Sequence, residues 1–226
     1  VIGGGGREHA IIRKIKESPL CGKVYCAPGN GGIAADAECI PSVKATDVEG
    51  AVRLAQEKKV GFVIVAPDDP LVLGMVDALE AAGIPAFGPR KNAAILEGSK
   101  AFAKDLMKKY GIPTAAYEIF TDAEAAIAYV RAQNAYPTVI KADGLALGKG
   151  VIIAQSEQEA VTAIRDMLEG GRFGDSGRRI VVEQFLSGPE VSVLALTDGE
   201  VVRPLCSSMD HKRALDNDEG LNTGGM

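Results

Sequence analysis

Short apolar runs alternate with segments of helical periodicity over the first 98 residues. The predicted strands lie at residues 1–2, 23–27, 61–65 and 85–88, and the predicted helices at 7–16, 47–59 and 71–82. The run 61–65 is continuously apolar, as in a parallel strand that is covered on both faces. Because strands and helices alternate with short connections, we predict a doubly wound parallel sheet. Ligands of such sheets bind beyond the carboxyl ends of the strands, where the turn 3–6 and residues 66–70 would both lie.

The pattern changes in the second half, which reads as mixed α+β structure around antiparallel strands. Helices are predicted at 99–110, 122–133 and 156–168, and strands at 139–153 (as a hairpin), 179–185, 191–197 and 200–205. Gly111 and Pro113 end the first of these helices, and Ser156 begins a capping-box pattern. Asp198-Gly199 is a strong hairpin turn.

Composition and charge narrow the class of protein. A chain of 226 residues with 46% hydrophobic and 24% charged residues indicates a soluble globular protein with room for two compact units. A net charge of −5 argues against a nucleic-acid or membrane-surface partner, and no apolar run approaches the roughly 20 residues that span a bilayer. The four cysteines lack CxxC spacing and only His9 and His211 are histidines, so a zinc site is not expected. Reduced cysteines in a cytoplasmic enzyme are the simplest interpretation.

The hairpin at residues 139–151 carries the most informative chemistry. A β-branched pair leads into Lys141, and a glycine-spaced tip carries Lys149 before the next strand. Glycines let backbone N–H groups approach phosphate oxygens, and lysines supply point charges. The segment differs from a P-loop, because three residues separate Gly144 from Gly148 and a strand follows in place of a helix. Spacing alone leaves two interpretations open, a polyphosphate-binding tip and a solvated loop.

The glycine run 3–6 invites a dinucleotide-binding interpretation, which fails twice. The final glycine position of the fingerprint falls on Glu8 or His9, and no carboxylate follows the second strand. What remains is a glycine turn at a helix N-terminus, which binds a phosphate group or is simply a tight turn.

Three other segments are ambiguous alone. Glu183 lies on a strand and would recognise an adenine edge or, as the commoner case, simply face outward. A charged surface loop is the commoner explanation of the run 210–213, and Asp68-Asp69 could be a capping pair for the helix at Leu71.

The order of these segments resembles the ATP-grasp superfamily, whose two α+β lobes hold ATP between them. Within it, the chain is similar over its whole length to the phosphoribosylamine–glycine ligase family. The segments that carry the resemblance are Gly3–Ala10, Ala27–Asn30, Leu96–Lys104, Lys141–Gly150, Asp210–Arg213 and Asn222–Met226. The resemblance implies a Rossmann-like domain at 1–98, a linker helix and start of the ATP-grasp core at 99–119, a lid subdomain at 120–186 and the start of the larger lobe, truncated, at 187–226.

The resemblance also implies an activity, the ATP-dependent ligation of glycine to 5-phosphoribosylamine with Mg²⁺ or Mn²⁺. The expected catalytic residues are Lys141, Asp210 and Lys212. The expected ATP-binding residues are Lys100, Lys141, Gly144, Gly148, Lys149, Gly150, Glu183, Phe185, Leu186 and Glu190. The expected substrate-binding residues are Gly4, Gly5, Gly6, Arg7, Glu8, Pro67, Asp68, Asp210, Lys212, Asn222, Thr223 and Gly224. A monomer acting on small molecules is expected, without nucleic-acid or membrane partners.

Two departures qualify the resemblance. Ala66 and Asp68 stand where the family usually has glycine and glutamate, and the shorter carboxylate moves back by about one methylene, so its substrate contact is open. The chain is expected to be a C-terminally truncated piece, inactive alone, with the metal ligands beyond Met226. Another ATP-grasp ligase and a non-catalytic nucleotide-binding protein are the alternatives. The first shares the lysines but is not expected to have both the 210–213 and 222–226 segments, and the second would bind ATP without glycine-dependent turnover.

Overall fold

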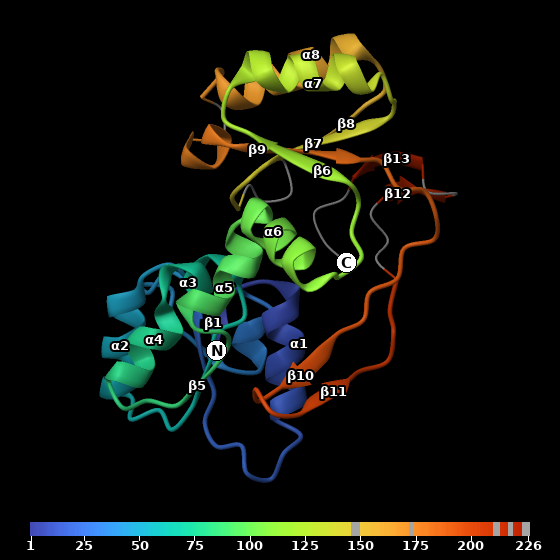
Figure 1. Cartoon of the computed structure of the whole chain (residues 1–226). Helices are drawn as coiled ribbons and strands as arrows, with labels where there is room; N and C mark the ends of the chain where they lie inside the picture. The colour runs from blue at the N-terminus through green and yellow to red at the C-terminus, as the bar shows by residue number, and fades with distance from the viewer. Residues whose placement is uncertain (146–149, 172–173, 210–212, 217–218, 223–226) are drawn as a thin grey trace.

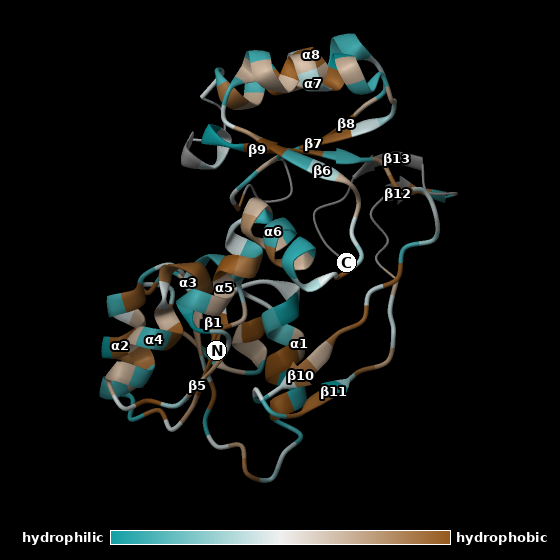
Figure 2. Cartoon of the chain, in the orientation of Figure 1, coloured by the Kyte–Doolittle hydropathy of each residue, from teal (hydrophilic) through white to brown (hydrophobic). Residues whose placement is uncertain are grey.

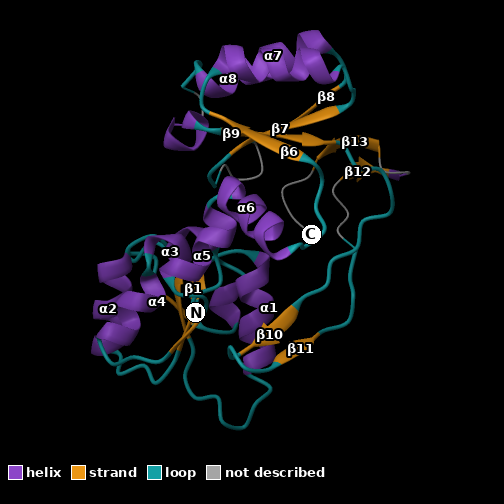
Figure 3. Cartoon of the chain, in the orientation of Figure 1, coloured by secondary structure: helices purple, strands orange, loops and turns teal. Residues whose placement is uncertain are grey.

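The computed structural model describes residues 1–145, 150–171, 174–209, 213–216 and 219–222. Its N-terminal part alternates strands and helices, and its later part is built on an antiparallel sheet (Figures 1 and 3). Among the described residues, no helix is long and apolar enough to cross a bilayer.

The N-terminal part holds a parallel sheet. Its elements are β1 (Ile2–Gly3), α1 (Gly6–Ile15), β2 (Tyr25–Pro28), η1 (Ile33–Ala35), β3 (Glu38–Cys39), α2 (Val48–Glu57), β4 (Val63–Ile64), α3 (Asp68–Leu73), α4 (Met75–Ala81), β5 (Ala86–Phe87) and α5 (Lys91–Gly98). Strands β1, β2 and β3 pair in parallel, as do β4 and β5. A parallel bridge from Ile2 to Val65 joins the two groups, giving the order β3-β2-β1-β4-β5. The predicted doubly wound sheet is confirmed.

The core of this part is apolar and continuous. Ile2 and Val63 from the sheet pack in one cluster with Met75 and Leu79 from α4, and both of these α4 side chains are fully buried. Burial of such side chains is the main stabilising contribution to a fold of this kind.

One predicted helix was wrong in its extent. The helix expected at 71–82 begins at Asp68 and is broken at Gly74, whose φ of +92° suits a residue without a Cβ. Asp68 and Asp69 occupy the first turn of α3, where negative charge is favoured, so they do not cap a helix starting at Leu71. Helix α5 was not predicted.

The later part centres on a four-stranded sheet. Its elements are α6 (Lys100–Tyr110), β6 (Tyr117–Phe120), α7 (Ala123–Gln133), β7 (Thr138–Ala142), β8 (Val151–Ala154), α8 (Glu157–Leu168), η2 (Gly174–Arg178) and β9 (Ile180–Gln184). The strand order is β6-β9-β7-β8 and every neighbouring pair is antiparallel. Two hairpins follow, β10 (Ala195–Thr197) with β11 (Val202–Pro204) and β12 (Arg213–Leu215) with β13 (Glu219–Asn222).

Local signals explain these elements. Asp122 caps α7 by accepting from the Ala125 N–H at 2.8 Å, and Ser156 caps α8 by accepting from the Glu159 N–H at 3.3 Å. Gly111 ends α6 in the left-handed conformation. The predicted hairpin of β7 and β8 is confirmed, with Lys141 opposite Val151.

The two faces of the four-stranded sheet differ. Helices α7 and α8 cover one face, and α6 lies on the other side of the sheet (Figure 1). Figure 2 shows apolar central strands beneath helices that are apolar only in part. Ile140 and Ile180 point to the helix-covered face and pack against Ile164 of α8. Because strand side chains alternate, the neighbouring residues Lys141 and Val181 point to the opposite face, which carries the candidate site.

Candidate active site

A charged cluster lies on the α6 side of the sheet. Lys141 on β7 and Glu183 on β9 are diagonal neighbours, since Lys141 pairs with Val181 and Glu183 with Val139. The Lys141 ammonium donates to Glu183 Oε2 at 2.9 Å. Lys104, from α6, places its ammonium 3.3 Å from the same oxygen. One buried carboxylate therefore serves two cations that come from a strand and from a helix.

Glu183 is enclosed, with 6% of its surface exposed. The interpretation of Glu183 as an outward-facing strand residue is therefore wrong. Its other oxygen, Oε1, is buried and has no hydrogen-bond partner among the residues that the structure describes. A buried acceptor without a partner is costly, which makes Oε1 suited to a donor N–H supplied by a ligand.

Lys104 was not predicted as a site residue, although the sequence holds a signal for it. Lys100 and Lys104 are four residues apart in one helix and so lie on the same face. Lys104 is 6% exposed and donates to Thr114 Oγ1 at 2.7 Å. A lysine so deeply buried needs acceptors, and Glu183 and Thr114 supply them.

Lys100 is the first residue of α6, and it reaches the root of the glycine loop. Its ammonium donates to the Gly144 carbonyl at 2.8 Å. Burial lowers the pKa of Lys100 below its ordinary value, and the positive charge of Lys141 acts in the same direction. The two lysines are thus neighbouring cations, an arrangement that an anionic ligand would relieve.

The root of the glycine loop is tightly packed. A Cβ at Gly144 would lie 2.7 Å from the Ser176 Cβ, a contact too close to tolerate. At the other root, the Gly150 carbonyl accepts from the Ala142 N–H at 2.8 Å. Gly148 and Lys149 lie outside the described residues.

The predicted adenine hinge follows directly on the charged cluster. Phe185 and Leu186 come after the end of β9 and are 37% and 64% exposed, and Glu190 further along is also exposed. The hinge residues stay a prediction.

The glycine turn and the segment after β4 meet at one edge of the parallel sheet, as predicted. The Arg7 guanidinium donates to the Ala66 carbonyl at 3.5 Å and lies 4.0 Å from Asp68 Oδ1. Pro67 precedes α3 as its N-cap. Gly5 and Gly6 are exposed at the N-terminus of α1, an electropositive position suited to a phosphate.

Two residues of this turn have structural partners. Glu8 is 5% exposed, and its carboxylate accepts from the Gly5 N–H, so it caps α1 from within. A Cβ at Gly4 would lie 2.8 Å from the Gly29 carbonyl oxygen, and the Gly4 carbonyl accepts from the Asn30 side chain at 2.7 Å. The substrate roles predicted for Gly4 and Glu8 must be compatible with these contacts.

The remaining predicted residues belong to the last part of the chain. Asp210, Lys212, Thr223 and Gly224 lie outside the described residues. Asn222 is the last residue of β13. Among the residues that the structure describes, no group of three His, Cys, Asp or Glu side chains is placed to hold a metal ion.

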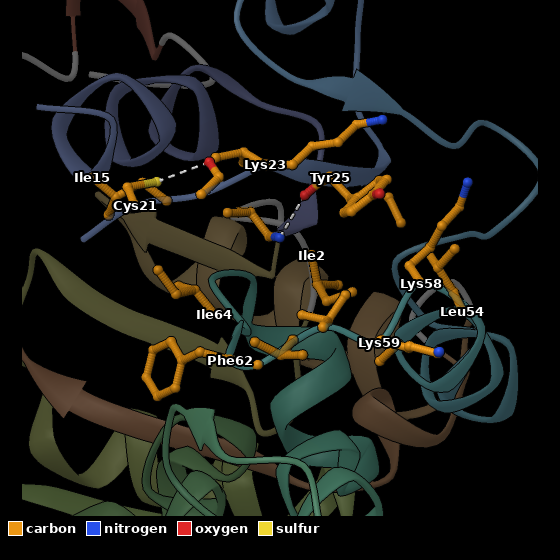
Figure 4. Close-up of a pocket in the computed structure, with 18 of the residues that line it drawn as sticks. Ile2, Ile15, Cys21, Lys23, Tyr25, Leu54, Lys58, Lys59, Phe62 and Ile64 are labelled. Atoms are coloured by element: carbon orange, nitrogen blue, oxygen red, sulfur yellow. Dashed lines mark hydrogen bonds between the residues drawn. The ribbon is translucent and has the colours of Figure 1, made fainter. Parts of the chain in front are cut away.

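A cavity of about 740 Å³ lies elsewhere, between the start of β1 and the segments that lead into β2 and β4 (Figure 4). Its walls include Ile2, Tyr25, Leu54 and Phe62, and the backbone nitrogen of Val1 donates to the Tyr25 carbonyl there at 2.8 Å. These are the amino ends of the strands, the end opposite the glycine turn. The cavity is therefore separate from the predicted site.

Comparison with known proteins follows the same division of the chain. The family model for the phosphoribosylglycinamide synthetase N domain matches residues 1–97, and that for the ATP-grasp (A) domain matches residues 98–226. A phosphoribosylamine–glycine ligase from Yersinia pestis is 55% identical, covering 100% of this chain and 53% of the relative. One from Haemophilus influenzae is 52% identical with the same coverage. The chain spans about half the length of the curated relatives it matches.

Solved structures agree on the fold. The phosphoribosylamine–glycine ligase of Thermotoga maritima superposes with a TM-score of 0.82 at 33% identity, covering 100% of this chain and 53% of that one. N5-carboxyaminoimidazole ribonucleotide synthetase of Thermus thermophilus gives 0.67 at 21% identity, covering 90% and 52%, which shows the fold alone. An N-terminal parallel sheet followed by an ATP-grasp lobe is thus a shared architecture. Together with the two family models, which match the whole chain, these likenesses show that the chain belongs to the phosphoribosylglycinamide synthetase family.

Proposed function

We propose that the protein to which this chain belongs ligates glycine to 5-phosphoribosylamine, using ATP and forming glycinamide ribonucleotide, ADP and phosphate. The observation that carries the proposal is the pair of partly buried lysines at the glycine-loop root, Lys100 and Lys141, beside the unpartnered Oε1 of Glu183. Two cations and one buried acceptor are the complement of a nucleoside triphosphate, whose phosphates are anionic and whose adenine carries an N–H donor.

The reaction divides into two steps that balance. A glycine carboxylate oxygen attacks the γ-phosphorus, the bond to the β-phosphate oxygen breaks, and ADP leaves glycyl phosphate behind. The ribosylamine nitrogen then attacks the carbonyl carbon, phosphate leaves with the bonding electrons, and the nitrogen loses a proton. Phosphoryl transfer depends on positioning and charge stabilisation, which Lys100 and Lys141 would supply.

The other ATP contacts follow from the order of the chain. The loop from Gly144 to Gly150, with Gly148 and Lys149, would cover the phosphates and exclude water from the acyl phosphate. Glu183, Phe185 and Leu186 would hold the adenine, and Glu190 would contact the ribose.

The substrates would bind at two places. The turn of Gly4, Gly5, Gly6, Arg7 and Glu8, with Pro67 and Asp68, would hold the sugar phosphate at the edge of the parallel sheet. Asp210 would bind the glycine ammonium, with Lys212 and the residues Asn222, Thr223 and Gly224 completing the site.

Mg²⁺ or Mn²⁺ would neutralise phosphate charge, but no described residue is assigned to it. We further propose that the protein is a cytoplasmic monomer.

The test is ADP release by the full-length protein with Mg²⁺, freshly generated phosphoribosylamine and glycine, each omitted in turn. Release that requires both substrates, and that Lys141→Ala abolishes, is the expected result. ATP binding without glycine-dependent release would contradict the proposal and favour another ligase or a nucleotide-binding protein without turnover.

A further inference from the structure

Asp143 joins three elements through hydrogen bonds that both of its carboxylate oxygens accept. The Ser99 hydroxyl lies 3.0 Å from Oδ1 and 3.1 Å from Oδ2, and the Ala101 N–H donates to Oδ1 at 2.6 Å. The Arg179 guanidinium donates to Oδ2 from Nε at 2.8 Å and also from Nη2. The elements joined are the N-terminus of α6, the end of β7 and the start of β9.

In the cluster of Ser99, Asp143 and Arg179, the carboxylate and the hydroxyl are buried, whereas the Arg179 side chain is 45% exposed. Asp143 and Ser99 are 7% and 8% exposed. The carboxylate sits at the N-terminus of α6, where free N–H groups and the helix dipole favour negative charge. Two donors from one guanidinium add a directional ion pair on the other side. A buried carboxylate with this many donors fixes the relative position of the groups that supply them.

Two of the segments that Asp143 holds together, the start of α6 and the end of β7, carry Lys100 and Lys141. Lys100 stands between Ser99 and Ala101, both of which are bound to Asp143. Lys141 precedes Asp143 by two residues, on the strand that Asp143 follows. The ammonium of Lys100 donates to the carbonyl of Gly144, the residue that follows Asp143. Asp143 therefore links the start of α6, which carries Lys100, to the end of β7, which carries Lys141.

We propose that Asp143 is a positioning residue for the polyphosphate site, acting through Lys100 and Lys141 without touching the ligand. This inference rests on the proposed function, because it requires that the lysine pair binds nucleotide phosphates. It goes beyond that function because it assigns Asp143 to the binding of the phosphates alone. Adenine binding is assigned to Glu183 and the hinge. A merely structural Asp143 would affect both parts of the nucleotide alike.

The experiment compares nucleotides that differ in their phosphates. Inhibition constants of ADP and adenosine, and KM for ATP, are measured on the full-length enzyme and its Asp143→Asn variant. Asparagine keeps the size of the side chain but loses the charge that Arg179 and the helix N-terminus require. We expect KM for ATP and the ADP inhibition constant to rise roughly tenfold or more while the adenosine constant changes less than about twofold.

Matched variants keep the result interpretable. Ser99→Ala removes one donor to Asp143 and Ser99→Thr retains it, so alanine should shift the ratio of the ADP to the adenosine constant and threonine should restore it. Asp166→Asn, an exposed acid on α8 behind the sheet, is the control and should leave the ratio unchanged. If Asp143→Asn does not fold, the serine pair provides the test.

Two outcomes would contradict the inference, and a third would contradict the proposed function on which it rests. Equal weakening of ADP and adenosine would make Asp143 a general structural residue, and unchanged constants would deny it any role. If the unaltered enzyme shows no saturable use of ATP, the proposed function itself fails.

Discussion

The Glu183 carboxylate lies between two ammonium groups, with Lys141 Nζ at 2.9 Å and Lys104 Nζ at 3.3 Å from the same oxygen. The Lys104 and Glu183 side chains are only 8% and 6% exposed, whereas Lys141 is 27% exposed. The Glu183 carboxylate neutralises part of the charge of both lysines, so they can lie on the α6 side of the sheet without a bound anionic ligand. Lys141 is the partner with access to solvent and so to a ligand.

Glu183→Gln should destabilise the protein. The change keeps the shape of the side chain but leaves two ammonium groups without their anion, and breaking a buried ion pair in this way costs on the order of 3 kcal/mol. We expect the free energy of unfolding of this lobe to fall by about that amount in urea denaturation. Glu118→Gln, an exposed acid on β6, is the control, with an expected effect within about 0.5 kcal/mol. Equal stability of the two variants would contradict the buried network.

ATP binding should weaken at alkaline pH because of Lys100. Burial lowers the pKa of Lys100 from its ordinary value of 10.5, whereas bound phosphates would raise it again. ATP binding then takes up a proton, and affinity falls as pH rises through the pKa of the free protein. Lys100→Arg keeps its charge over this range and should flatten the dependence. The ATP affinity of the unaltered protein and of Lys100→Arg is measured by calorimetry at pH values where ATP is fully ionised. If the two affinities fall in the same way as pH rises, Lys100 is not responsible.

The same shift predicts the sign of a stability change in the protein without ligand. Folding disfavours the charged form of Lys100, so the unfolded chain binds more protons between the lowered pKa and 10.5. The contribution of Lys100 therefore opposes folding at lower pH and disappears as pH rises through this window. Stability of Lys100→Met relative to the unaltered protein should decline across that window in parallel denaturation curves.

Gly144→Ala should impair ATP use through a steric clash that a second change relieves. The new Cβ would meet the Ser176 side chain, whose Cβ would be 2.7 Å away, and would push the loop root from its position beside Lys100. We expect KM for ATP to rise severalfold in Gly144→Ala and to recover in the double variant with Ser176→Gly. Gly61→Ala, where a Cβ meets open space, is the control. If KM for ATP stays high in the double variant, the contact with Ser176 is not the cause of the effect.

Local signals were enough to predict most elements of the fold. Strand runs, the Ser156 cap and the hairpin around Asp198-Gly199 depend on a few residues and were correctly identified, although Thr197 pairs with Val202, so the hairpin loop runs over residues 198–201. The break at Gly74 was missed because the apolar periodicity continues across it, from Leu71 to Leu79, and one glycine in a helix costs only about 1 kcal/mol.

The sheet rule correctly brought the glycine turn and residues 66–70 to one edge, but the lysine cluster was predictable from residue patterns only where its members are near in sequence. Lys141 and the glycine loop were recognised as one hairpin. The burial of Glu183 was not predicted, because it depends on Lys104. This lysine lies 79 positions earlier in the chain, on α6. Asp143 gave no signal beside a glycine, where a short acid is typical of a loop. Its partners Ser99 and Arg179 are brought to it only by tertiary packing.

The glycine turn offers a last test, because two of its glycines differ in what surrounds them. A Cβ at Gly4 would lie 2.8 Å from the Gly29 carbonyl oxygen, whereas a Cβ at Gly6 would meet nothing within 4 Å. Gly4→Ala should therefore lower the thermal unfolding midpoint. Gly6→Ala should leave it unchanged and raise KM for phosphoribosylamine severalfold, since the methyl group would occupy space at the helix N-terminus where the sugar phosphate is proposed to bind. KM for ATP in Gly6→Ala is the internal control and should not change. If Gly6→Ala alters neither constant, the phosphate lies elsewhere and the glycine turn is required only for folding.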